Sequence, residues 1–139
     1  LGDETALPAI ARWLEELPAT ARGVVAIEIE DAAEQHVLHA PDGMEITWLP
    51  RDGAPAGTGT RLADFARGLA VPAGSQPYVW AAGETHAVKP LRHWARELGL
   101  GKEQAHITGY WRRGIAGDIL PGARGTAASL LPGLFGGRG

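Results

Sequence analysis

The chain of 139 residues has the length of one ordinary domain, and its 45% hydrophobic and 21% charged residues are proportions typical of a globular protein. A formal net charge of −3 argues against nucleic-acid binding through bulk charge, and the absence of cysteine excludes disulfides, thiolate metal sites and cysteine nucleophiles. No apolar run is long enough for a membrane span and no signal-peptide pattern opens the sequence, so we expect a cytoplasmic protein.

The first half of the chain predicts a helix, a strand, a helical turn and a second strand. Apolar positions recur at helical spacing from Leu7 to Leu17, and Asp3 or Thr5 can cap the start of this helix. A strand rich in β-branched residues follows over residues 24–30, with Val25, Ile27 and Ile29 on one face. The helical turn is expected over residues 31–35 and the second strand over residues 45–49.

The second half predicts two helices that alternate with two strands. After a loop over residues 54–60, Thr60 can cap the first of these helices. The apolar run 78–82 is typical of a strand covered on both faces, and residues 106–111 form the last strand. The helical positions expected to face the core are Leu62, Phe65, Ala66 and Leu69 in the first helix, and Val88, Leu91, Ala95 and Leu98 in the second.

This alternation predicts an α/β fold, a three-layer α/β/α Rossmann-like parallel sheet. Ligands of such sheets bind at the carboxyl ends of the strands. From Gly114 onward glycine and proline become frequent and periodicity ends, so we divide the chain into a domain over residues 1–114 and a tail over residues 115–139.

The first strand of this fold is expected to be largely missing from the chain. If the turn at Gly2 and Asp3 joins a strand to the first helix, that strand lies before Leu1 and leaves a central slot in the sheet. The tail segment 127–131 could supply a strand that fills the slot, in the same molecule or in a neighbour.

The turn from Gly2 to Pro8 places backbone N–H groups at the start of a helix, where a phosphate is favoured. It lacks the GxGxxG pattern, and the carboxylates of Asp3 and Glu4 would repel a phosphate. A plain capping turn is therefore as good an interpretation as a ligand loop.

Four segments of the chain, taken together, resemble a known family. They are GDETALPA from Gly2, WLPR from Trp48, YVWAAGE from Tyr78 and GYWRRG from Gly109. In this order they resemble the C-terminal domain of the siderophore-interacting protein family, the flavin-dependent ferric-siderophore reductases. That family is similar to the ferredoxin–NADP reductase superfamily, in which a flavin-binding β-barrel precedes a five-stranded nucleotide domain.

The resemblance implies an NADPH-binding domain that passes hydride from NADPH to FAD, so that a ferric siderophore is reduced. Its partner would be an N-terminal β-barrel that holds most of the FAD, and we expect this chain to be inactive alone. No side chain need act as acid, base or nucleophile, so no catalytic residue is predicted. Alternatives are a non-enzymatic binding module and a flavoreductase domain with another electron acceptor.

Residues can be assigned from this resemblance. Asp3, Glu4, Thr5 and Ala6 match a loop beside the pyrophosphate and nicotinamide, and Gly83, Glu84 and Thr85 match a loop over the nicotinamide ribose. Thr85 could equally cap the helix that follows. Arg51 matches a basic position that meets the adenosine 2′-phosphate, which favours NADPH over NADH, although a solvated turn arginine is the alternative.

The remaining assignments concern the flavin and the siderophore. Tyr110 and Trp111 match an aromatic position near the flavin ring, or are simply packed. Lys89, Arg112 and Arg113 could attract an anionic ferric siderophore, or form an ordinary solvated basic edge. No metal site is predicted, because His36 and His39, like His86 and His93, lack companion ligands and are better interpreted as surface residues.

Overall fold

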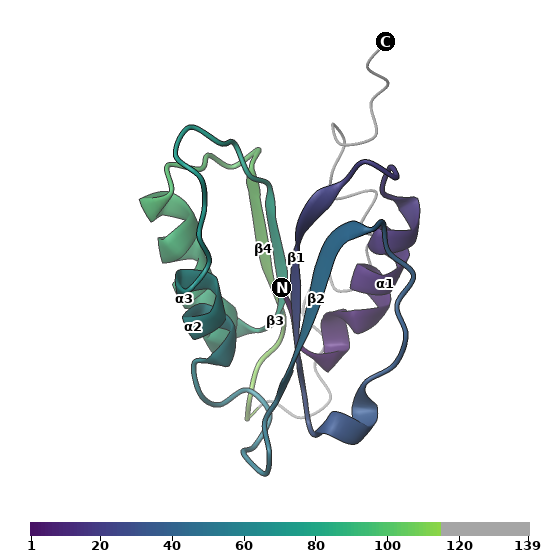
Figure 1. The fold of residues 1–139 in the computed structure, drawn as a ribbon. Helices are drawn as coiled ribbons and strands as arrows, with labels where there is room; N and C mark the ends of the chain where they lie inside the picture. The colour runs from purple at the N-terminus through teal and green to yellow at the C-terminus, as the bar shows by residue number, and fades with distance from the viewer. Residues whose placement is uncertain (115–139) are drawn as a thin grey trace.

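The computed structural model describes residues 1–114, which form parallel strands flanked by helices (Figure 1). The strands are β1 (Arg22–Ile29), β2 (Gly43–Pro50), β3 (Val79–Glu84) and β4 (Ala105–Trp111). The helices are α1 (Leu7–Glu16), α2 (Arg61–Arg67) and α3 (Thr85–Glu97), with 3-10 turns η1 (Glu4–Ala6) and η2 (Ala32–Glu34). The predicted order of elements is confirmed, whereas the predicted tail and its segment 127–131 lie outside the described residues.

The sheet consists of two parallel pairs, β1 with β2 and β3 with β4, joined through the start of the chain. The Gly2 N–H donates to the Ala26 carbonyl (3.0 Å), and the Glu28 N–H donates to the Gly2 carbonyl (2.8 Å). On the other side the Ala82 N–H donates to the Leu1 carbonyl (3.1 Å). Leu1 and Gly2 therefore lie in the predicted central slot of the sheet, and Figure 1 marks the N-terminus between β1 and β3.

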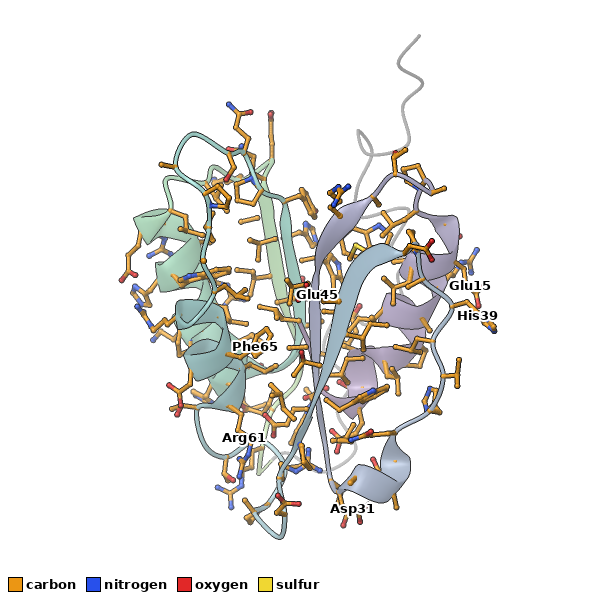
Figure 2. All side chains as sticks on the ribbon, in the orientation of Figure 1. Glu15, Asp31, His39, Glu45, Arg61 and Phe65 are labelled. Carbon is orange, nitrogen blue, oxygen red and sulfur yellow. The ribbon has the colours of Figure 1, made fainter. Side chains whose placement is uncertain are left out.

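Helices cover both faces of the sheet, as the three-layer prediction requires. On one face α1 packs Ile10 and Leu14 against the side chains of Val25, Ile27 and Ile29, as predicted for β1. On the other face α2 and α3 pack together over β3 (Figure 1), where their buried residues are Leu62, Ala66, Val88, Leu91 and Trp94. Phe65 and Leu69 are half-buried, and Figure 2 shows Phe65 on the sheet side of α2. No helix within residues 1–114 combines the length and hydropathy needed to cross a membrane.

The helix caps differ from the sequence prediction at two places. Glu84, and not Thr85, caps α3, because its carboxylate accepts from the N–H groups of His86 and Ala87. Thr60 precedes α2 as expected, but its hydroxyl donates to the Asp64 carboxylate (2.7 Å) and makes no cap hydrogen bond. A carboxylate one residue upstream therefore displaces Thr85, whose hydroxyl donates instead to the Trp111 carbonyl (2.9 Å).

Gly109 in β4 is required by the close approach of α3. A Cβ added there would lie 2.5 Å from the Thr85 hydroxyl oxygen and 3.1 Å from Thr85 Cα. We expect Gly109→Ala to lower the free energy of unfolding by about 2 kcal/mol, the cost typical of overpacking. Urea denaturation measures this loss, with Gly101→Ala as the matched control because nothing lies within 4 Å of its added Cβ. Equal stability of the two variants would contradict the packing described.

Candidate functional site

Charged side chains from separate parts of the chain meet at the carboxyl end of the sheet. Asp3 follows the central Gly2, Glu28 lies near the end of β1, Arg51 follows β2 and Glu84 ends β3. All four are buried, with 6%, 5%, 5% and 1% of their respective surfaces exposed. Asp31 and Arg61 mark this end of the molecule in Figure 2. The predicted ligand loops therefore converge on one edge of the sheet, as the parallel arrangement requires.

Asp3 connects the central turn to β3 and β4. Its Oδ1 accepts from the Thr5 N–H (2.9 Å) and from the Thr5 hydroxyl. Its Oδ2 accepts from the Glu84 N–H (3.1 Å) and from the Trp111 indole Nε1 (2.8 Å). The carboxylate thus ties together three segments, and its acceptor positions are already used by the protein.

Glu84 is the most buried of these carboxylates, and three backbone N–H groups and the His86 ring surround it. Its Oε2 accepts from the N–H groups of His86 (2.7 Å) and Ala87 (2.9 Å). Its Oε1 accepts from the Arg113 N–H (3.1 Å) and lies 3.2 Å from His86 Nδ1. Burial alone would raise the pKa of Glu84, but the hydrogen bonds from Arg113, Ala87 and His86 outweigh it and lower the pKa. Glu84 is therefore a fixed anion and a poor general acid.

Arg51 lies between two carboxylates and not in solvent. Its Nη2 donates to Glu4 Oε1, and its Nη1 lies 3.5 Å from Glu28 Oε1. The hydrogen bond that Arg51 donates to Glu4 is the main reason that the pKa of Arg51 is raised. Burial raises the pKa of Glu28, and the nearby Arg51 charge opposes that effect. Arg51 Nε is buried without a hydrogen-bond partner, and Nη1 has only its 3.5 Å contact with Glu28.

The loop after β2 covers part of this edge. The chain turns at Asp52 and Gly53, where φ is 49° and 97°. Further along, a Cβ added at Gly57 would lie 2.8 Å from Glu84 Cγ and 2.9 Å from Trp111 Cη2. The loop therefore packs directly on Glu84 and Trp111.

Two hollows open beside this loop. One, of about 520 Å³, is lined by Glu30, Asp31, Arg51, Gly53, Ala54, Pro55 and Ala56. The other, of about 580 Å³, is lined by Gly57, Glu84, His86, Arg113 and Gly114. Both lie where a parallel α/β sheet binds its ligands.

The remaining predicted residues of the two ligand loops have mixed surroundings. Thr5 is exposed and Ala6 is fully buried in the α1 face of the core. Gly83 is buried, and a Cβ there would lie 2.9 Å from Asp3 Oδ2. The absence of a side chain at Gly83 is therefore needed for the approach of Asp3.

The two aromatic residues of the last strand have different surroundings. Tyr110 is buried in the core beneath α1, where its ring makes an edge contact with Trp80 at a centroid distance of 6.4 Å. Burial raises the pKa of Tyr110. Trp111 is half-buried at the edge of the sheet, with its indole hydrogen-bonded to Asp3. Trp111 is thus the aromatic that the structure brings to the site.

The predicted basic residues and histidines lie on the surface. Lys89, Arg112 and Arg113 are exposed, and Arg113 borders the hollow beside Glu84. Within residues 1–114 no hydrogen bond or ion pair joins Lys89 to the buried charged residues at the carboxyl end of the sheet. His36, His39, His86 and His93 are exposed as predicted. In this part of the chain no group of three or more histidine or carboxylate side chains could hold a metal ion.

Sequence reasoning missed Glu28, Arg61 and Gly57 as parts of the site. Glu28 interrupts an otherwise apolar strand on the face opposite Val25, Ile27 and Ile29, and this was a usable signal. Arg61 Nη2 donates to the Arg51 carbonyl (3.1 Å) and fixes the turn after β2. No local pattern predicted this contact, nor the packing of Gly57, because both depend on how the loop folds back.

Comparisons with known proteins give matches to the sequence and to the fold. The family model described as siderophore-interacting protein matches residues 1–114. Ferric vibriobactin reductase ViuB of Vibrio cholerae is 35% identical over 115 residues, which cover 81% of this chain and 42% of that protein. The crystal structure of a siderophore utilization protein from T. fusca is 46% identical, with a TM-score of 0.77 over 83% of this chain and 44% of that one.

A second solved structure, the siderophore-interacting protein SipS from Aeromonas hydrophila, is 32% identical with a TM-score of 0.71. It matches 82% of this chain and 45% of its own. The chain thus spans less than half the length of the relatives named here. Since the family model covers most of its residues, the chain belongs to the siderophore-interacting protein family.

Proposed function

We propose that this chain is the NADPH-binding domain of a flavin-dependent ferric-siderophore reductase. The observation that carries the proposal is the convergence of the turn after Gly2 with the ends of β1, β2 and β3 at one edge of a parallel sheet. Membership of the family supports it, as does the name of the ferric vibriobactin reductase. In this role hydride passes from NADPH to FAD, and Fe(III) held by a siderophore is then reduced to Fe(II).

The residues of the site suit binding and orientation better than proton transfer. Asp3 and Glu84 are saturated by internal hydrogen bonds, so neither is free to move a proton. Arg51 would contact the 2′-phosphate of NADPH through its guanidinium, whose forked donors fit phosphate oxygens. The segments Asp3–Ala6 and Gly83–Thr85 would lie along the pyrophosphate and nicotinamide ribose, and Trp111 would lie beside the flavin. The cofactors supply the redox chemistry, and the chain supplies position and electrostatics.

The proposal includes a partner domain and a cellular location. FAD would be held mainly by an N-terminal β-barrel, with Trp111 near its ring, since Tyr110 is buried in the core. Lys89, Arg112 and Arg113 would attract an anionic ferric siderophore toward the flavin edge. Release of iron from an imported siderophore is a cytoplasmic task, so the complete reductase would act there.

The decisive experiment combines this chain with the FAD-loaded N-terminal barrel of a siderophore-interacting protein. We expect NADPH oxidation and Fe(II) production from a ferric siderophore by the mixture, and none by either part alone, because hydride transfer needs both cofactors in one site. A chromogenic Fe(II) chelator measures the product. Iron reduction by this chain with NADPH and free FAD would contradict the assignment.

Calorimetric titration with NADPH and NADH separates this function from its alternatives. NADPH should bind more tightly than NADH if Arg51 contacts the 2′-phosphate. A non-enzymatic binding module with the same fold but no dinucleotide site would bind neither NADPH nor NADH. A flavoreductase with another acceptor would bind NADPH but show no preference for ferric siderophores once reassembled.

A further inference from the structure

We propose that Glu4 sets the preference of this domain between NADPH and NADH. Its carboxylate pairs with the Arg51 guanidinium, which a ribose 2′-phosphate would need for binding. This inference rests on the proposed function and names a specificity residue for it. The buried Arg51 is already paired, and one of its two partners is far easier to displace than the other.

The position of Arg51 is fixed from several directions. Its backbone N–H donates to the Ile29 carbonyl (2.8 Å), and its own carbonyl accepts from Arg61 Nη2 (3.1 Å). If the guanidinium moved into solvent, Glu28 would remain buried without its charge partner, which costs free energy. An incoming anion must therefore come to Arg51 and exchange with a group that is already there.

Glu4 is the partner that can exchange. Its side chain is 32% exposed, whereas the Glu28 side chain is 6% exposed. Releasing Glu4 returns a half-buried carboxylate to water, at much lower cost than releasing a fully buried one. Glu4 also belongs to a 3-10 turn of three residues, which rearranges more easily than a strand. A phosphate would take its place with geometry that a guanidinium binds well.

The adjoining hollow provides the access route for such a ligand. Arg51 borders it together with the loop after β2 and the acidic residues Glu30 and Asp31. Carboxylates there suit the hydroxyl groups of an adenosine ribose as hydrogen-bond acceptors. They also repel a phosphate, so Glu4, Glu28, Glu30 and Asp31 together oppose the attraction of Arg51 and Arg61. The ratio of affinities for ligands with and without a 2′-phosphate is therefore lower than Arg51 alone would give.

The test compares two fragments that differ only in the 2′-phosphate, adenosine 2′,5′-bisphosphate and adenosine 5′-monophosphate. Both are titrated calorimetrically into the full chain and into Glu4→Gln, and the ratio of their Kd values is taken. We expect Glu4→Gln to raise the preference for the bisphosphate about tenfold, the effect of freeing one charge-assisted hydrogen bond. The matched control is Glu16→Gln, whose carboxylate is 33% exposed and paired with Arg12 on the outer face of α1.

The control should keep the wild-type ratio, and the gain should disappear when Glu4→Gln is combined with Arg51→Lys, which keeps the charge but loses the forked donors. Far-UV circular dichroism checks that each variant is folded. An unchanged ratio in Glu4→Gln, or an equal rise in Glu16→Gln, would overturn the inference while leaving dinucleotide binding intact. Absence of NADPH and NADH binding in every variant would instead overturn the proposed function together with it.

Discussion

Replacing Glu84 with alanine is expected to lower the free energy of unfolding by about 3 kcal/mol, because it removes a helix cap and takes the acceptor from three part-buried N–H groups. The N–H groups of His86, Ala87 and Arg113 all lose their acceptor at once. These groups come from the start of α3 and from the residues after β4, so the loss should loosen the attachment of both. Urea denaturation at pH 7 measures the change.

A matched carboxylate on the surface provides the comparison. Glu97 pairs with Arg67 across exposed helix faces (3.0 Å), and Glu97→Ala should cost less than about 1 kcal/mol, as exposed ion pairs do. If the two alanine variants unfolded at the same urea concentration, the capping role of Glu84 would be wrong. Glu84→Gln, which keeps the shape but not the charge, should fall between them.

The contribution of Glu84 also depends on pH. Since its folded-state pKa lies below the ordinary value of 4.5, its stabilising effect is fully present above that value and is lost as the pH falls through the folded-state pKa. The difference in unfolding free energy between wild type and Glu84→Ala should therefore stay constant near neutrality and shrink in acid. A difference that grew on acidification would have the wrong sign.

The sequence predicted the elements that depend on local patterns. Residues Val25, Ile27 and Ile29 alternate along β1, and this alternation is sufficient to identify the face that meets α1. The doubly buried β3 was predicted in the same way, because an apolar run ending at a glycine is typical of a covered parallel strand. The central position of Gly2 followed from the same reasoning about strand and turn order.

Capping and burial at the carboxyl edge were predicted less well. Thr85 is a good cap by residue type, but Glu84 precedes it and reaches the same N–H groups with a full negative charge. For Arg51, the alternative to phosphate binding was a solvated turn arginine, yet the residue is buried between Glu4 and Glu28. These outcomes depend on contacts between residues distant in sequence, which no local pattern contains. For the same reason the two residues of the predicted Tyr110–Trp111 pair separate, one into the core and one to the edge.

Removing the charge of Arg51 is the second change with a large expected effect. Arg51→Met should lower the free energy of unfolding by about 3 to 4 kcal/mol at pH 7, because breaking a buried pair leaves Glu28 as an uncompensated charge. Replacing both partners, in Arg51→Met/Glu28→Leu, should recover much of this loss, since no buried charge is then left alone. Thermal and urea unfolding of the three proteins measure the difference.

The same variant tests the electrostatic cause through pH. Burial already raises the pKa of Glu28, and without Arg51 that pKa rises further. At a pH above this folded-state pKa, ionised Glu28 destabilises the fold. The destabilisation is relieved as the pH falls through the folded-state pKa. Arg51→Met should therefore regain stability relative to wild type as the pH is lowered from 7, and the double variant, which lacks the carboxylate, should show no such gain. If the single variant were pH-independent, the loss would come from packing of the arginine stem and not from its charge. The buried pair would then be a structural contact with no spare electrostatic attraction for a phosphate, and the exchange proposed between Glu4 and a 2′-phosphate would lose its driving force.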